Sequence, residues 1–370
     1  MKQNVVNLLL PVFFLIVSCT EPYQFPEIER QTTIVITGMI TNEAGPYFVR
    51  VEENVSNLST LITAQRAIND ARVTITDSNG NVDELHSFLS VALDSALIVW
   101  DPKPEWWWEG MPDSYEYFYN IPDEQGGYVK FIVDNYGWIS YDIRDGAYFT
   151  TTTKGIPGHS YTLKVEYAGR EYTATDYMCH GTVIDSISEE PLGKYVNGKP
   201  DGSDGFMVPC LYFAEPQDEV NFYMFTMCAT TSNRTYIGEG KFKTETSAKP
   251  AKELTLRQWI VEDWGFSVIS DRFLPPYVNQ YKMSDGDHAR KWFQGTDMGF
   301  YGGWGSGIAM YCITEPVYRY YAALSKQYYD DGGAFAPSPA SPPTNFRGGA
   351  QGCFSAASVS QYISEPVFIQ

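Results

Sequence analysis

The sequence lacks an apolar run long enough for an ordinary membrane-spanning helix. Its longest mostly apolar stretch, Val5–Val17, lies near the N-terminus and follows Lys2. This stretch is shorter than the ~18 residues that a spanning helix needs. A positive charge followed by a short apolar segment is typical of a secretory signal peptide. We therefore expect residues 1–18 to be a signal peptide, and the protein to be anchored to a membrane without crossing it.

The end of this segment, Leu15–Cys19, carries a more specific signal. An apolar residue, then a small Ser18, then a cysteine form a bacterial lipobox. The cysteine thiol accepts a diacylglycerol, and the small residue lets the peptidase cut just before it. The alternative is an ordinary secretory signal with an incidental cysteine. Because the position and the neighbouring residues match a lipobox, we predict lipidation of Cys19. The lipid bilayer would then be a partner, since each buried methylene contributes roughly 0.8 kcal/mol to anchoring. The polar residues 19–31 would form a tether.

Basic residues are few. The chain has 26 Lys and Arg against 45 Asp and Glu, a formal net charge of -19. Such a balance argues against nucleic acid, and against an anionic membrane surface, as partners. It does not indicate a fold.

Histidine is scarce too, and no residue pattern typical of catalysis is present. The 4 histidines do not occur in a metal-binding spacing. The segment Ser284–His288 brings carboxylates and an imidazole together, but a turn is the preferred interpretation. No nucleophile elbow, phosphate loop or dinucleotide fingerprint occurs. We predict no metal, no other cofactor and no enzymatic activity. A glycan-acting hydrolase is the least favoured alternative, because any two carboxylates could serve it.

The remaining cysteines give no metal site, since none forms a CxxC pair. They are Cys179, Cys210, Cys228, Cys312 and Cys353. Their odd number leaves at least one free or bound to another molecule. An oxidising compartment permits disulfides, but the sequence does not give their pairing. We expect most of the five to be buried as small apolar residues.

What the sequence does contain is many short alternating segments separated by turns. Arg72–Thr76 alternates and is followed by the turn Asp77–Gly80, and Ser160–Tyr167 has period two. Strands of this length and spacing predict an all-β protein. We expect an N-terminal immunoglobulin-like β-sandwich over residues 32–180.

A second β-rich domain is expected over residues 181–370. Asn221–Ala229 and Tyr236–Thr244 are expected to be separate strands within it. One helix, Glu315–Tyr329, is expected to pack on a sheet, because its apolar residues recur at helical spacing. Thr314 is its expected N-cap.

Residues 89–145 interrupt the strand rhythm as an aromatic-rich insertion, with its own hairpin near Tyr128–Val133. Three consecutive tryptophans cannot all face one core, because strand side chains alternate and helix side chains fan out. The insertion could bury its rings over the sandwich or the second domain, which we prefer. Alternatively, it presents a surface for a glycan or peptide ligand or for a partner protein. The candidate residues of this surface are Trp106, Trp107, Trp108, Tyr115, Tyr117 and Tyr119.

Two groups of segments resemble a known family. They are Ile36–Thr41, Gly45–Val51, Ala71–Gly80 and Gly155–Thr175, and then Tyr318–Leu324, Pro343–Gly349 and Gly352–Phe354. Together they resemble the domain-of-unknown-function family 4249, lipoproteins of Bacteroidota with an N-terminal region similar to the carboxypeptidase regulatory-like domain. The resemblance covers most of the mature chain and departs from the family pattern at residues 89–145. It implies an outer-membrane lipoprotein, on the periplasmic face or at the cell surface, often encoded near TonB-dependent receptors. It implies no established activity.

Three classes of function follow. The first is a binding or accessory lipoprotein that works with a TonB-dependent outer-membrane receptor. The second is a structural or adhesive cell-surface protein. The third is the hydrolase.

Overall fold

A computed structural model describes residues 32–57, 62–105, 107–134, 145–191, 194–196, 199–201, 207–238, 241–248, 267–282, 306–329 and 341–363. Within these ranges the protein is all-β with one α-helix, α4, which confirms the predicted fold class. The strands are β1 (Thr32–Thr41), β2 (Phe48–Asn57), β3 (Ile62–Ala67), β4 (Arg72–Asp77), β5 (Val82–Glu84), β6 (His86–Ser87), β7 (Leu93–Val99), β8 (Tyr115–Pro122), β9 (Tyr128–Asp134), β10 (Ala147–Phe149), β11 (Ser160–Tyr167), β12 (Arg170–Tyr177), β13 (Ile184–Pro191), β14 (Lys194–Val196), β15 (Lys199–Asp201), β16 (Met207–Ala214), β17 (Phe222–Gly238), β18 (Lys241–Ala248), β19 (Ser267–Ser270), β20 (Tyr277–Lys282), β21 (Ser306–Ile313) and β22 (Gln351–Ile363), and α4 is Glu315–Tyr329.

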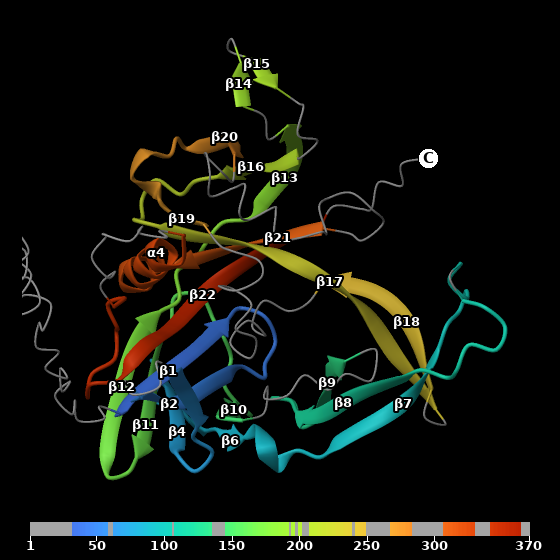
Figure 1. Cartoon of the computed structure of the whole chain (residues 1–370). Coiled ribbons are helices and arrows are strands. Elements are labelled where there is room, and N and C mark those ends of the chain that lie inside the picture. The colour runs from blue at the N-terminus through green and yellow to red at the C-terminus, as the bar shows by residue number, and fades with distance from the viewer. Residues whose placement is uncertain are drawn as a thin grey trace, which may run out of the picture.

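The largest sheet has 13 strands, and its main path runs β6-β10-β2-β1-β22-β21-β17-β18-β7-β8-β9. The last strand, β22, lies in the middle of this path, as Figure 1 shows. It pairs in parallel with β1 and antiparallel with β21. The same sheet therefore continues across residue 181, where we expect the second domain to begin.

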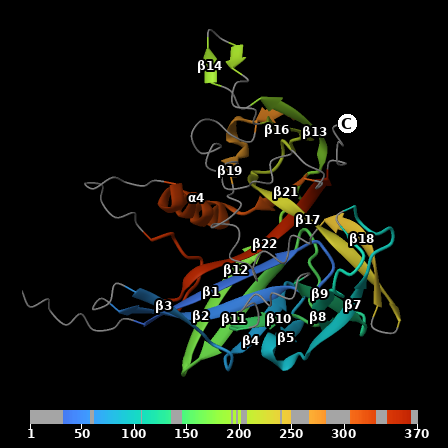
Figure 2. The same ribbon diagram turned by 45° about the vertical axis from the view of Figure 1, so that its right-hand side comes forward.

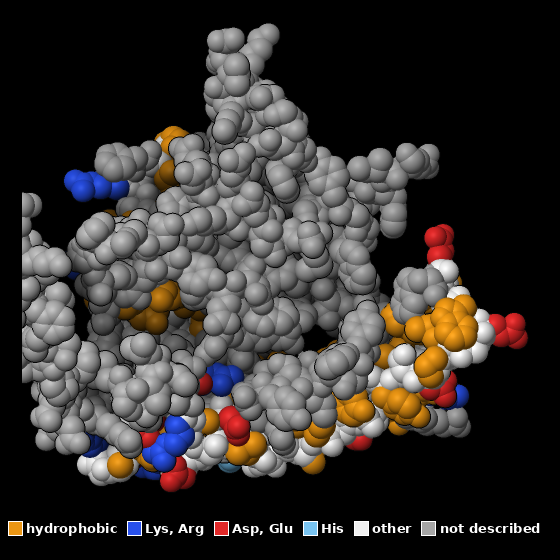
Figure 3. All heavy atoms as spheres, in the orientation of Figure 1, with side chains coloured by type: hydrophobic (Ala, Val, Ile, Leu, Met, Phe, Trp, Pro, Cys, Tyr) orange, Lys and Arg blue, Asp and Glu red, His pale blue; other side chains and the backbone are white. Residues whose placement is uncertain are grey.

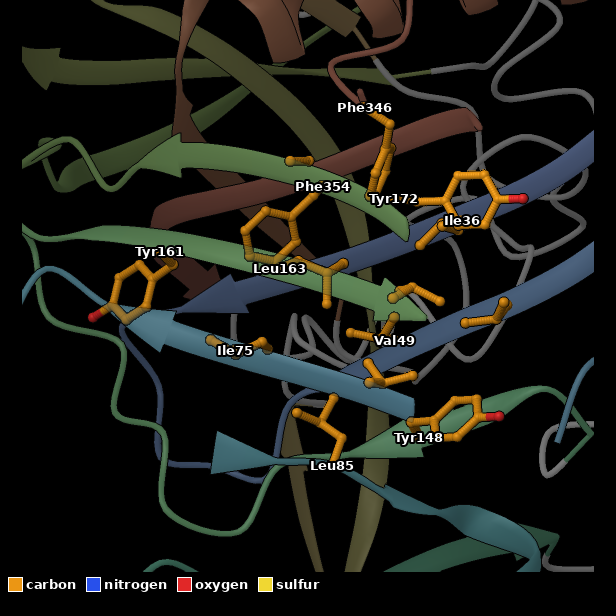
Figure 4. Close-up of a cluster of buried hydrophobic side chains, with 14 of the residues drawn as sticks. Ile36, Val49, Ile75, Leu85, Tyr148, Tyr161, Leu163, Tyr172, Phe346 and Phe354 are labelled. Carbon is orange, nitrogen blue, oxygen red and sulfur yellow. The ribbon is translucent and has the colours of Figure 1, made fainter. Parts of the chain in front are cut away.

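A four-stranded sheet, β12-β11-β4-β5, packs against the β1, β2 and β22 part of the large sheet. The alternation in β11 explains this packing: Tyr161, Leu163 and Val165 are all buried. They meet residues such as Val49 and Phe354 from the opposite sheet (Figure 4). Burying each large apolar side chain contributes roughly 1.5–3 kcal/mol, so this interlayer core holds the two sheets face to face.

A second core lies between the three-stranded sheet β13-β16-β20 and the strands β17 and β21. Helix α4 has the predicted bounds and lies beside β19 and β21 in both ribbon views (Figures 1 and 2). Val317, Tyr320 and Leu324 pack on this part of the sheet, as the helical spacing predicts. The Thr314 carbonyl accepts the hydrogen bond from the Tyr318 amide, 2.9 Å away. The Thr314 hydroxyl, however, donates to Asp176 at 2.5 Å, so it serves a tertiary contact.

One strand prediction is wrong. Asn221–Ala229 and Tyr236–Thr244 are not two separate strands, because β17 runs unbroken from Phe222 to Gly238. The polar sequence Thr230–Thr235 separates the two expected segments, but its backbone pairs with β18. Among the described residues, no helix combines the length and apolar character needed to cross a bilayer.

Candidate ligand-binding surface

The described part of the aromatic-rich segment forms an arm of three antiparallel strands, β7, β8 and β9. The β8–β9 hairpin agrees with the one expected near Tyr128–Val133. The arm joins the rest of the sheet through β7, which pairs in parallel with β18. In Figure 1, β7 and β8 extend from the sandwich toward the turn between β17 and β18. This arm carries the candidate residues that the structure describes.

The inner end of the arm is a core of aromatic rings. Tyr119, Ile121 and Phe131 pack with Phe48 and Phe88. Tyr119 is only 1% exposed, and its ring centroid lies 5.0 Å from that of Phe88. Tyr119 therefore contributes to core packing and is not exposed to a ligand.

The same face of β8 becomes exposed toward the outer end of the arm. Tyr115, Tyr117 and Tyr119 share this face, because strand side chains alternate. Tyr117 is half-buried, and Tyr115 is 48% exposed. Tyr115 pairs with Leu97, which pairs in turn with Lys241 of β18. The outer end of the arm thus presents a tyrosine, a leucine and a lysine in one row.

The loop between β7 and β8 places a tryptophan beside this outer end. Two tight turns shape it: the Trp107 amide donates to the Pro104 carbonyl, at 2.9 Å, and the Met111 amide donates to the Trp108 carbonyl, at 3.0 Å. Lys103 Nζ lies 3.4 Å from the centroid of the Trp107 ring, a cation–π contact that holds this half-buried indole. Trp108 is 60% exposed.

Gly110 lies beside the exposed indole of Trp108. Its φ of +97° favours glycine, and a Cβ at this position would lie 3.2 Å from the Trp108 ring. A side chain at this position would meet the edge of the indole, so glycine leaves room for the Trp108 ring.

The opposite face of β8 is fixed by a buried ion pair. Glu116 is fully buried, and its carboxylate lies 3.0 Å from Lys130 Nζ on β9. Lys130 Nζ also lies 5.6 Å from the centroid of the Phe118 ring. Glu116 and Phe118 are therefore both buried on this face, and the exposed tyrosine lies on the other.

Acidic side chains surround the loop. Asp101, Glu105, Glu109 and Asp113 are all exposed. In the space-filling view, hydrophobic and acidic side chains gather at the outer end of the arm (Figure 3). An aromatic ring bordered by carboxylates can stack on a sugar ring while accepting hydrogen bonds from its hydroxyl groups, or can bind a cationic peptide.

The structure therefore places Trp107, Trp108 and Tyr115 at the outer end of the arm and Tyr119 in the core. Cys19 and Trp106 lie outside the described residues. Two exposed residues at the end of β17, Tyr236 and Ile237, were not predicted from the sequence. Their proximity to the arm depends on the parallel pairing of β18 with β7, which local sequence does not reveal.

Among the described residues, no group of three or more His, Cys, Asp or Glu could hold a metal ion. Four cysteines are buried with free thiols: Cys179, Cys210, Cys312 and Cys353. This agrees with the expectation that most cysteines pack as small apolar residues. Cys228 lies in β17, but its side chain is outside the described part of the chain.

The fold and surface define a class of protein: a β-sandwich whose large sheet extends into an arm with exposed aromatic residues. The chain belongs to the family described as Domain of unknown function (DUF4249), which matches residues 20–363. This confirms the family suggested by the sequence. None of the curated proteins matches the chain.

Proposed function

We propose that the protein is a non-catalytic binding lipoprotein, held at the outer membrane by lipid on Cys19, that uses the aromatic arm to contact a ligand or partner. In this proposal it works as an accessory component of a TonB-dependent outer-membrane transporter. The membrane and transporter parts rest on the lipobox and on the family resemblance. The binding part rests on the geometry of the arm.

The observation that carries the binding part is the exposure of Trp108 and Tyr115 at the outer end of the arm, away from its aromatic core. Tyr119 and Phe131 of the same strands are buried, so Trp108 and Tyr115 are exposed although the arm has a core in which aromatic residues can pack. Exposed Trp and Tyr are enriched at binding surfaces because they offer large, rigid contact area with a polar edge. A ligand that covers about 100 Å² of these rings would gain roughly 2.5 kcal/mol.

A pull-down from native outer membranes tests the proposal. The bait is the intact lipoprotein, and the variant combines Trp107→Ala, Trp108→Ala and Tyr115→Ala. We expect the wild type to recover a β-barrel transporter and the triple variant to recover roughly 100-fold less, with an unchanged melting temperature. Tyr128→Ala is the matched control, because Tyr128 is 70% exposed at the far end of the same β8–β9 hairpin.

Other outcomes would contradict the proposal. A large loss of thermal stability with undiminished recovery of the transporter would make the three rings core residues. Recovery of envelope or host-matrix material without a transporter would favour the structural or adhesive function. Cleavage of glycans by the wild type would contradict a non-catalytic role. Binding of the wild type to a glycan array, lost in the triple variant, would identify the ligand as a sugar.

A further inference from the structure

Two of the buried cysteines meet where the sandwich leads into the C-terminal strands. Cys179 follows β12 and is 8% exposed, while Cys312 lies in β21 and is 2% exposed. Both belong to the core cluster beneath β13 and β16. About 130 residues of chain separate them, so their meeting is a feature of the tertiary fold.

The backbone around Cys179 lies directly across strands β21 and β22. Ser358 of β22 is the cross-strand neighbour of Cys312, and its hydroxyl donates to the Cys179 carbonyl. A Cβ on Gly181 would lie 3.3 Å from Cys312 Cβ and 2.8 Å from Ser358 Cβ. The segment from Cys179 to Gly181 thus packs without a gap on the strand pair that carries Cys312.

The two thiols influence each other's ionisation in this setting. Cys312 lowers the pKa of Cys179, despite the opposing effect of burial, while Cys179 and burial raise the pKa of Cys312. Cys312 Sγ also lies 3.4 Å from Asn221 Oδ1.

Cys353 provides a contrast. It is equally buried, but its Sγ lies 3.7 Å from the carbonyl oxygen of Phe354. Burial raises its pKa well above the usual value. Its surroundings favour an inert core thiol.

We propose that Cys179 and Cys312 form the intramolecular disulfide of this chain when it is exposed to a disulfide oxidant. The thiolate of one of the two cysteines attacks the oxidant's disulfide, forming a mixed disulfide and releasing one oxidant thiol. The thiolate of the other cysteine then attacks the protein sulfur of the mixed disulfide and releases the second oxidant thiol. The protein loses two protons and two electrons, and the oxidant is reduced to a dithiol. Because both thiols are buried in the folded state, this exchange takes place before the segment from Cys179 to Gly181 closes over β21.

The consequence is a covalent link between the end of the sandwich and the strands behind it. Closing so long a loop restricts the unfolded chain and is expected to raise the melting temperature by roughly 5–10 °C over the reduced protein. The occurrence of the disulfide in cells rests on the proposed export of the protein. The pairing itself rests only on the geometry.

The test is peptide mapping of the full-length protein isolated from membranes, alkylated in denaturant without reduction. We expect tryptic peptide 171–194 to be linked to peptide 292–319. Cys179→Ser and Cys312→Ser should each remove the link and the dependence of the melting temperature on reductant. Cys353→Ser should retain both.

A parallel sample, refolded with oxidised glutathione, separates the two proposals. A link in this sample but not in membrane-derived protein would support the pairing and overturn the exported location. Absence of the link from both samples, with both thiols alkylated, would overturn the pairing. A link between other cysteines would overturn it equally.

Discussion

At the scale of single residues, two buried aspartates illustrate opposite balances between burial and hydrogen bonding. Burial disfavours ionisation of Asp83, but hydrogen bonds from three consecutive threonines, Thr151–Thr153, outweigh it and lower its pKa. Asp176 is also buried, and there burial outweighs the hydrogen bonds from Thr314 and Ala356, so its pKa is raised to about 7. Asp83 thus anchors a loop as a carboxylate, whereas Asp176 changes charge near neutral pH.

Asp176 should therefore make stability depend on pH. Its pKa is about 7 in the folded state, against a reference value of 3.8 for the unfolded chain. Between these values the folded state holds a proton that the unfolded state has lost, so the unfolding free energy falls as pH rises through this window. The total fall is up to about 4 kcal/mol. Asp176→Asn should remove it, so that the variant gains stability relative to wild type from pH 5 to pH 8 in urea unfolding.

Asp83→Asn is the control for this measurement. The pKa of Asp83 is lowered below its usual value of 3.8, so the stability that its charge provides is lost only at acidic pH below that value. Its destabilisation should be the same at pH 5 and pH 8. Parallel profiles for wild type and Asp176→Asn would contradict the assignment of a titrating Asp176.

At the scale of elements, local periodicity predicted some boundaries correctly and missed others. Helix α4 and strand β11 have their predicted bounds, because each buries one face and shows the corresponding period in sequence. The polar middle of β17 gave no such signal, because its pairing with β18 satisfies the backbone whatever the side chains are. The sequence likewise did not predict that Trp108 is the exposed ring. Three adjacent tryptophans indicate that at least one ring is exposed, but not which one.

Gly352 lets the last strand pair with the first. Its φ is +97°, and a Cβ there would lie 2.1 Å from the Ile36 carbonyl oxygen of β1. Gly352→Ala should therefore cost the backbone strain of about 1 kcal/mol and also push β22 from β1, for a total of roughly 3 kcal/mol or more. Chemical denaturation measures this loss.

Gly80→Ala separates strain from the steric clash. Gly80 has a φ of +86°, but no atom lies within 4 Å of the position that an alanine Cβ would take, so only the strain of about 1 kcal/mol applies. Equal losses in the two variants would show that the clash between the alanine Cβ and the Ile36 carbonyl adds nothing to the backbone strain.

At the scale of the whole molecule, β22 connects regions that the sequence suggests are separate. It pairs with β1, more than 300 residues earlier, and with β21. Alternation can indicate that each strand has a buried face, but it does not identify a strand's neighbour at such separation. The sandwich could therefore be predicted from local patterns, whereas the continuous sheet that carries the aromatic arm could not.

The proposed attachment to a membrane depends on one residue, Cys19, which lies outside the described residues. Cys19→Ala would remove the proposed lipid acceptor and the residue before which the peptidase is expected to cut. We expect the variant to lose labelling by radioactive palmitate and to remain unprocessed or to enter the soluble fraction, since the hydrophobic anchoring free energy is lost with the acyl chains. Cys353→Ser, which changes a buried cysteine of β22, should retain both the label and the membrane association. Palmitate labelling that persists in Cys19→Ala would place the lipid elsewhere and remove the basis for the proposed anchor.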